Sequence, residues 1–101
     1  MSAERLTADS RLIAREGVVS RQVEQETVLV LPEQGQVKVL NPVGGLIWSL
    51  LDGRRSAAAI AESVCRQFTV EPAQAQADTL AFLEDLLERG LVDLAGDVRA
   101  S

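Results

Sequence analysis

The sequence contains no histidine and no tyrosine, and it has a single cysteine, Cys65, and a single lysine, Lys38. The absence of histidine excludes Cys–His and Ser–His pairs for nucleophilic catalysis. Together with the single cysteine, it also excludes the usual His- and Cys-based metal sites. One cysteine cannot form a disulfide within the chain, so a reducing compartment suits it best. We therefore expect a protein that is not an enzyme and that holds no metal or other cofactor.

Long hydrophobic runs are also absent. The densest, Val28 to Leu31, is far too short to span a bilayer, and the N-terminus lacks the apolar stretch of a signal peptide. The 101 residues are 47% hydrophobic and 25% charged, as in a globular domain, and 15 acidic against 10 basic side chains give a net charge of −5. That charge disfavours binding to a phosphate backbone. These features predict a small cytoplasmic domain without nucleic-acid or membrane partners.

The hydrophobic pattern divides the chain into three parts. Residues 1–17 have few large apolar side chains and are expected to form a flexible arm, with at most a helical turn over residues 9–15. Residues 18–94 carry the pattern of one domain, and residues 95–101 are expected to form a frayed tail. Within the domain, β-branched residues predict strands at 18–23, 27–31 and 37–40, joined by short turns. The third of these strands is expected to leave one edge open.

Three helices follow the strands in the pattern. Asn41 and Pro42 predict the first helix start, because Asn caps free N–H groups and Pro fits the first helical position. This helix is expected to run to about residue 51 and to stop at Gly53. Ser56 predicts the start of a second helix to about residue 67, and Pro72 that of a third to residue 89. Residues 91–94 predict a closing strand. The fold class is α+β: a winged helix-turn-helix with a three-stranded antiparallel β-sheet followed by three α-helices.

The third predicted helix has an unusually wide apolar sector. Its residues include Phe82, Leu83, Leu86 and Leu87, over roughly 160° rather than the ~100° that a surface helix needs. Two interpretations fit equally well: the helix is sandwiched in the core, or one margin of the sector lines a groove for a partner.

Other candidate sites have plainer explanations. Carboxylates on the polar side of the third helix, among them Asp78 and Asp85, are expected to be solvated rather than catalytic. Arg54 and Arg55 are expected in an exposed loop, and Cys65 as a small buried hydrophobic residue. The acidic third helix also argues against reading DNA in the major groove. Trp48 fits either the edge of the core or an anchor for a partner.

One set of motifs, taken together, resembles the PqqD family. The set comprises "LN" and "G..IW.LLDG" over residues 40–53, followed at family spacing by "D…FL..L..RGL" over residues 78–91. The resemblance covers about residues 18–94. It implies a RiPP recognition element: a winged helix-turn-helix that binds the leader segment of a ribosomally made precursor peptide. Such a protein delivers the peptide to a modifying enzyme, such as a radical SAM enzyme or a leader peptidase.

The resemblance also implies a binding mode, in which the leader adds as a strand to the third β-strand and packs on the third helix. On this basis the peptide-binding residues are expected to be the following: Val37, Lys38, Val39, Leu40, Asp78, Phe82, Leu83, Leu86 and Leu87. Trp48 is the candidate for enzyme docking. Some residues favour pyrroloquinoline quinone synthesis and others lasso-peptide synthesis. The alternatives are a winged-helix DNA-binding regulator and a docking subunit that binds no peptide.

Overall fold

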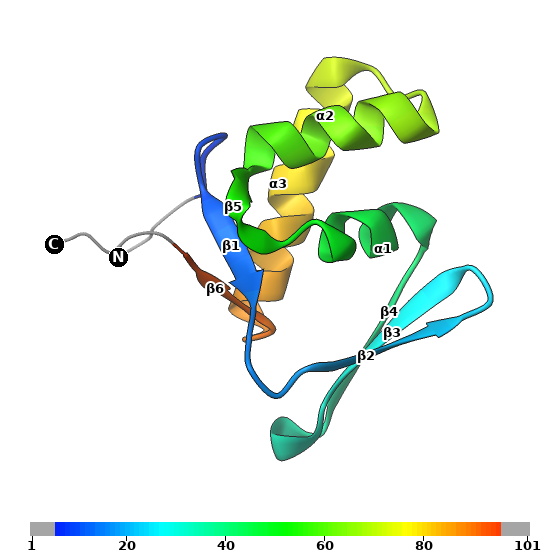
Figure 1. The fold of residues 1–101 in the computed structure, drawn as a ribbon, viewed down its shortest axis with the longest axis vertical. Coiled ribbons are helices and arrows are strands. Elements are labelled where there is room, and N and C mark those ends of the chain that lie inside the picture. Colours follow the sequence, from blue (N-terminus) through cyan, green and yellow to red (C-terminus); the bar gives the residue numbers. More distant parts are fainter. Residues whose placement is uncertain (1–5, 96–101) are drawn as a thin grey trace, which may run out of the picture.

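The computed structural model describes residues 6–95, which form an α+β arrangement of three α-helices and two antiparallel sheets (Figure 1). The strands of the first sheet lie in the order β5–β1–β6, and those of the second in the order β2–β3–β4. The elements in chain order are β1 (Arg11–Ala14), β2 (Val19–Val23), β3 (Glu26–Leu31), a short 3-10 helix η1 (Pro32–Gln34), β4 (Gln36–Leu40), α1 (Pro42–Ser49), β5 (Asp52–Ser56), α2 (Ala57–Phe68), α3 (Pro72–Glu88) and β6 (Val92–Leu94). Among residues 6–95, no helix is long and apolar enough to cross a bilayer.

The β2–β3–β4 sheet confirms the three predicted strands. Its register pairs Leu29 of β3 with Lys38 of β4, and Val30 with Val37. Because side chains alternate along a strand, Leu29, Leu31 and Leu40 turn to one face, where all three are buried. In Figure 1 this sheet extends away from α2 and α3, with α1 lying over its inner side. The chain turns between β3 and β4 at Gly35, whose positive φ of 65° suits glycine.

The three helix starts lie where the sequence predicts them. The Asn41 side chain accepts a hydrogen bond of 2.8 Å from the backbone N–H of Gly44, and the Ser56 hydroxyl accepts one of 3.2 Å from that of Ala59. Pro42 and Pro72 open α1 and α3. Capping side chains satisfy N–H groups that have no partner within the helix. The local sequence therefore determines where each helix begins.

The end of the first helix differs from the prediction. α1 stops at Ser49, and residues 52–56, expected to hold an exposed loop, form strand β5. This strand pairs with β1, with Arg11 opposite Ser56 and Ile13 opposite Asp52. The sequence Asp-Gly-Arg-Arg-Ser has no alternating apolar pattern, so only the long-range pairing creates the strand.

The expected N-terminal arm is also corrected for the residues that the structure describes. Residues 11–14 form β1, the central strand of the β5–β1–β6 sheet, and Leu6 and Leu12 are buried in the core. Arg15, directly after β1, forms an ion pair of 2.7 Å with Asp93 of β6. The packed domain therefore includes the chain from Leu6 onward. Residues 1–5 of the predicted arm and 96–101 of the predicted tail lie outside the described range. The predicted closing strand is confirmed as β6.

Candidate peptide-binding groove

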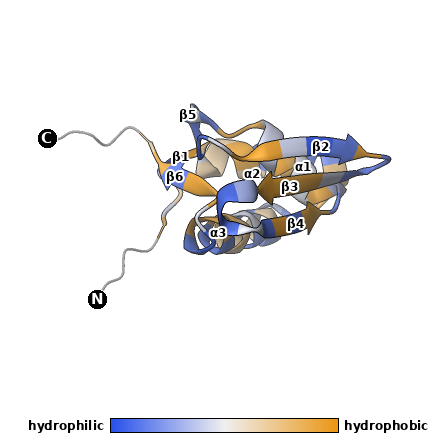
Figure 2. Cartoon of the chain, turned by 90° about the horizontal axis from the view of Figure 1, so that it is seen from below, coloured by the Kyte–Doolittle hydropathy of each residue, from blue (hydrophilic) through white to orange (hydrophobic). Residues whose placement is uncertain are grey.

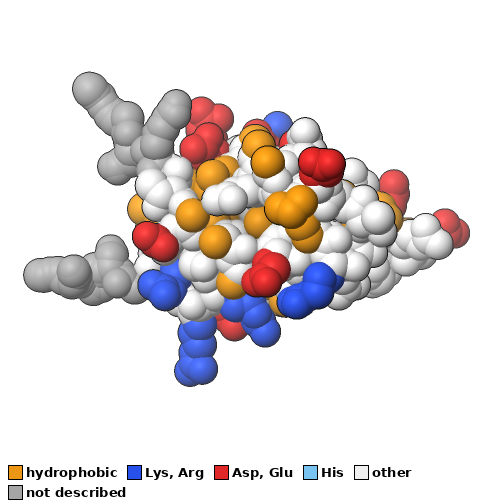
Figure 3. All heavy atoms as spheres, turned by 90° about the horizontal axis from the view of Figure 1, so that it is seen from above, with side chains coloured by type: hydrophobic (Ala, Val, Ile, Leu, Met, Phe, Trp, Pro, Cys, Tyr) orange, Lys and Arg blue, Asp and Glu red, His pale blue; other side chains and the backbone are white. Residues whose placement is uncertain are grey.

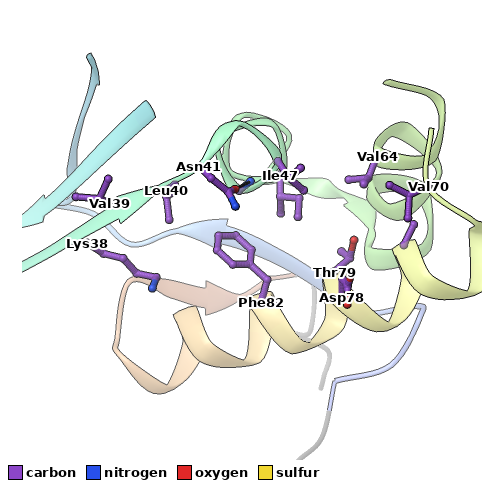
Figure 4. Close-up of a pocket in the computed structure, with 13 residues that line it drawn as sticks. Lys38, Val39, Leu40, Asn41, Ile47, Val64, Val70, Asp78, Thr79 and Phe82 are labelled. Atoms are coloured by element: carbon purple, nitrogen blue, oxygen red, sulfur yellow. Dashed lines mark hydrogen bonds between the residues drawn. The ribbon is translucent and has the colours of Figure 1, made fainter. Parts of the chain in front are cut away.

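A groove of about 470 Å³ runs between β4 and the helices (Figure 4). Strand β4, α1, the end of α2 with the segment that follows it, and α3 all contribute to its lining. The lining residues are Lys38, Val39, Leu40, Asn41, Val43, Gly44, Ile47, Val64, Val70, Ala75, Asp78, Thr79 and Phe82. Most of these side chains are apolar, as in surfaces that bind small molecules or peptide side chains.

Phe82 on α3 forms part of the groove wall, and its ring packs closely against a glycine of α1. A Cβ placed on Gly44 of α1 would lie 3.2 Å from Phe82 Cζ and 3.2 Å from Leu40 Cβ. A side chain at this position would therefore require the aromatic ring or the end of β4 to move by a few tenths of an ångström. The neighbouring Gly45 also lies at a close approach, since a Cβ there would be 2.7 Å from Thr27 Oγ1.

Strand β4 forms one border of the groove with an open edge. It is the last strand in the order β2–β3–β4, and no other strand within residues 6–95 pairs with the edge of β4 that faces away from β3. In an antiparallel ladder, the backbone groups of an edge strand that face away from its neighbour have no partner in the sheet. Leu40 is buried and Lys38 is half-buried on the inner face, whereas Val37 and Val39 are exposed on the outer face. Figure 4 shows the Lys38 side chain reaching toward α3.

Charged groups tie β4 to the end of α3. Lys38 Nζ and Arg89 Nε lie 3.4 Å and 3.0 Å from the same oxygen of Asp85, Oδ2. The Gln36 side chain donates a 2.7 Å hydrogen bond to the backbone carbonyl of Arg89. Partial burial acts to raise the pKa of Asp85, but the hydrogen bonds and charges of Arg89 and Lys38 together outweigh it, so the pKa lies below its ordinary value.

The structure separates the predicted peptide-binding residues into two groups. Lys38, Val39, Leu40, Asp78 and Phe82 all line the groove. Leu83 and Leu86 are fully buried in the core, so the expectation that their side chains meet a peptide is corrected. Leu87 is partly buried against the core and is not among the groove-lining residues, and Val37 lies on β4 with its side chain exposed. Trp48 is partly buried against the core.

Several groove residues were missed by the sequence analysis. Val64 and Val70, at the end of α2 and just after it, line the groove with Ala75 and Thr79 of α3. Nothing in the helical spacing of Val64 distinguishes a groove position from a core position. The positions become adjacent only because α2 and α3 pack together.

The other candidate residues that the structure describes make structural contacts. The Cys65 thiol donates a 3.2 Å hydrogen bond to the Val70 carbonyl. Within residues 6–95, no three Asp, Glu or Cys side chains come together as a metal site. Arg55 pairs with Asp52 at 2.8 Å. The groove itself offers apolar contacts and an open strand edge, and both can bind a partner.

Comparison with known proteins assigns the family. The family model described as coenzyme PQQ synthesis protein D (PqqD) matches residues 26–92. A PqqA binding protein of Rhodopseudomonas palustris (strain HaA2) is 34% identical over 73 residues, or 70% of this chain and 68% of the relative. A PqqA binding protein of Xanthomonas axonopodis pv. citri (strain 306) is 32% identical over 91 residues, covering 88% of this chain and 97% of the relative.

Solved structures share the same fold. The chain of TbiB1 in complex with the TbiA(beta) leader peptide is 29% identical, with a TM-score of 0.72 over 85% of this chain and 98% of that one. The PqqD part of Methylobacterium extorquens PqqCD, described as a stand-alone RiPP recognition element, gives a TM-score of 0.73 at 24% identity, covering 87% and 94% of the two chains. The family model spans most of the domain, from β3 to the start of β6, and the chain belongs to the PqqD family.

Proposed function

We propose that this protein binds the leader segment of a ribosomally synthesised precursor peptide and presents it to a modifying enzyme, without catalysing a reaction itself. The observation that carries the proposal is the open edge of β4 beside an apolar groove, in a chain of the PqqD family. An extended peptide beside such an edge gains backbone hydrogen bonds, and pockets for alternate side chains provide specificity.

The binding mode follows from the positions around the groove. The leader adds as a strand to β4, along the backbone of residues 37–40. Its inward side chains enter the groove and contact Phe82, while Asp78 and Lys38 offer charges of opposite sign at the border. We interpret the arrangement as a winged helix-turn-helix, with β2–β3–β4 as the wing and α2–α3 as the helix pair.

The partners follow from the same proposal. Relatives are called PqqA binding proteins, and one similar structure holds a leader peptide. By analogy, the ligand is a leader peptide of pyrroloquinoline quinone or lasso-peptide synthesis, and the enzyme is of the radical SAM or leader peptidase type. The reducing cytoplasm, where Cys65 remains a thiol, is the proposed location.

DNA binding is the weaker alternative. The last turns of α3 carry Glu84 and Asp85, which are half-buried, and Glu88, which is exposed, and the neighbouring Arg89 is already paired with Asp85. These carboxylates would repel a phosphate backbone.

The test is a fluorescence-anisotropy titration with labelled leader segments of the precursor peptides encoded beside this chain. We expect one of them to bind with a Kd at or below the order of micromolar, and Phe82→Ala to weaken that binding about tenfold or more. A folded protein that binds none of the leaders, but shifts duplex DNA at low salt in a sequence-selective way, would contradict the proposal.

A further inference from the structure

The outer face of the β2–β3–β4 sheet is a mostly apolar surface, with Arg21 and Glu26 as the charged residues of its paired rows. The register places Val19, Val30 and Val37 side by side in one row, and Val28 and Val39 side by side in the next. Val23 follows on β2, opposite Glu26. Side chains at directly paired positions lie on the same face of a sheet. We call these six residues the outer valine face: Val19, Val23, Val28, Val30, Val37 and Val39.

The outer valine face has no cover within residues 6–95. Val37 is 63% exposed, Val39 53%, Val23 51% and Val19 49%, and these four are among the six most exposed large hydrophobic side chains there. The inner face of the same sheet is buried against the rest of the domain, with Leu29 at 0%. Figure 2 shows the three strands side by side from below, with hydrophobic residues along β3 and β4. Contiguous exposed apolar surface of this kind marks an interaction site.

The other exposed large hydrophobic side chains within residues 6–95 are Ile13 and Leu94, on the β5–β1–β6 sheet. Seen from above, in Figure 3, apolar side chains lie near the middle of the surface, with acidic and basic ones mainly around them. The outer valine face carries a single cation, Arg21, in the row of Val28 and Val39. The concentration of valine on one sheet face therefore distinguishes it from the general surface.

Charges at the ends of the face indicate the partner. Glu24 and Glu26 are exposed at the β2–β3 turn, and Glu33 is exposed at the β3–β4 turn. Two copies packed face to face would set glutamates against glutamates whichever ends met, and each copy carries a net charge of −5. Such like-charge contacts are unfavourable. A partner that combines an apolar patch with flanking Lys or Arg side chains would match both the valines and the glutamates.

The face also continues into the proposed leader site. Val37 and Val39 lie on β4, the edge strand to which the leader would add. A peptide strand paired with β4 would place its outward side chains in the same rows as these valines. A protein bound to the outer valine face would thus contact the carrier and the adjacent leader strand together.

We propose that the outer valine face is the docking surface for the peptide-modifying enzyme, through an apolar patch flanked by basic side chains on that enzyme. This inference rests on the proposed function for the identity of the partner. It assigns the docking to the sheet face rather than to Trp48 of α1.

The test compares matched variants in binding to the purified modifying enzyme encoded beside this chain. Val19→Thr/Val30→Thr removes apolar surface while keeping β-branched side chains that suit a strand. Ile13→Thr is the control, because Ile13 is 42% exposed on the other sheet. Circular dichroism and thermal melting establish that each variant is folded, and fluorescence anisotropy gives the leader Kd separately.

We expect Val19→Thr/Val30→Thr to weaken enzyme binding about tenfold or more, with the leader Kd and the Ile13→Thr control unchanged. Replacing Glu24, Glu26 and Glu33 by Gln should weaken enzyme binding at low salt and have little effect at high salt. Unchanged enzyme binding by the valine variant would overturn the inference. A wild-type dimer in sedimentation that the valine variant dissociates would also overturn it, by assigning the face to a second copy. Failure of the wild type to bind any leader would contradict the proposed function alone, because enzyme binding is measured independently.

Discussion

Lys38 Nζ lies 3.4 Å from Asp85 Oδ2, which joins the inner face of β4 to α3 at the border of the groove. The same carboxylate also accepts a hydrogen bond from Arg89 Nε. A leader strand added to β4 must therefore pass next to an ammonium group that already has a partner. This arrangement makes Lys38 a site where an acidic leader residue would compete with Asp85.

This competition predicts opposite effects for two variants. Asp85→Asn frees Lys38 and should strengthen the binding of a leader with an acidic residue at that position, whereas Lys38→Met should weaken it. Because both side chains are partly exposed, each change is expected to be at most about fivefold. Titrations at two salt concentrations check this, and changes in the same direction for both variants would contradict the role of Lys38.

Gly44 lies where a larger residue would narrow the groove, so a side chain at position 44 should reduce leader affinity. In Gly44→Ala the new Cβ would press on the Phe82 ring and on Leu40. Since the ring is the more mobile neighbour, we expect it to move into the groove and weaken binding about tenfold.

Gly45→Ala is the control for this effect. Its Cβ would lie 2.7 Å from Thr27 Oγ1, on the side of β3, and Gly45 does not line the groove. This variant should lose stability while its folded fraction binds the leader normally. Equal leader affinities for Gly44→Ala and wild type, measured by calorimetry, would contradict the account.

The N-terminal strand should be essential for stability. Leu12 is buried in the core from β1, and its cross-strand partner Leu94 is half exposed. Leu12→Ala is expected to cost about 2–5 kcal/mol in the free energy of unfolding, and Leu94→Ala less than about 1 kcal/mol. Urea denaturation measures both free energies. If Leu12→Ala left the free energy of unfolding unchanged, the interpretation of this segment as a loose arm would be restored.

The ion pair between β1 and β6 predicts a stability change in acid. The hydrogen bond and charge of Arg15 hold the pKa of Asp93 below its ordinary value. A carboxylate with a lowered pKa in the folded state stabilises that state above its ordinary pKa of about 4, and the contribution disappears as the pH falls below that value.

Asp93→Asn should therefore be less stable than wild type at pH 6, with the difference shrinking by pH 3. Urea midpoints at the two pH values provide the measurement. A difference that stays constant across this range would exclude the ion pair as its cause.

Local chemistry made most of the fold predictable. Asn41, Ser56 and Pro72 identify helix starts because capping acts over three or four residues. Strand β5 and the N-terminal strand β1 escaped prediction because their pairing joins segments about forty residues apart, as Arg11 with Ser56. Neither segment has the strict alternation of apolar and polar residues that predicts a half-buried strand.

The candidate site was predictable only in part, for a related reason. The wide apolar sector on α3 fitted both a helix sandwiched in the core and a helix that lines a groove, and helical spacing could not say which margin faces the core. Packing of α3 buries Leu83 and Leu86 and leaves Phe82 in the groove. Val70 escaped notice because its part in the groove arises from the turn between α2 and α3.

Addition of a leader strand to β4 is the central claim, and amide hydrogen exchange tests it most directly. The exchange of residues 36–40 is measured with and without a saturating leader peptide. The account predicts that the β4 amides facing away from β3 exchange much more slowly in the complex, because they gain hydrogen-bond partners. Tight leader binding with unchanged exchange along β4 would contradict strand addition.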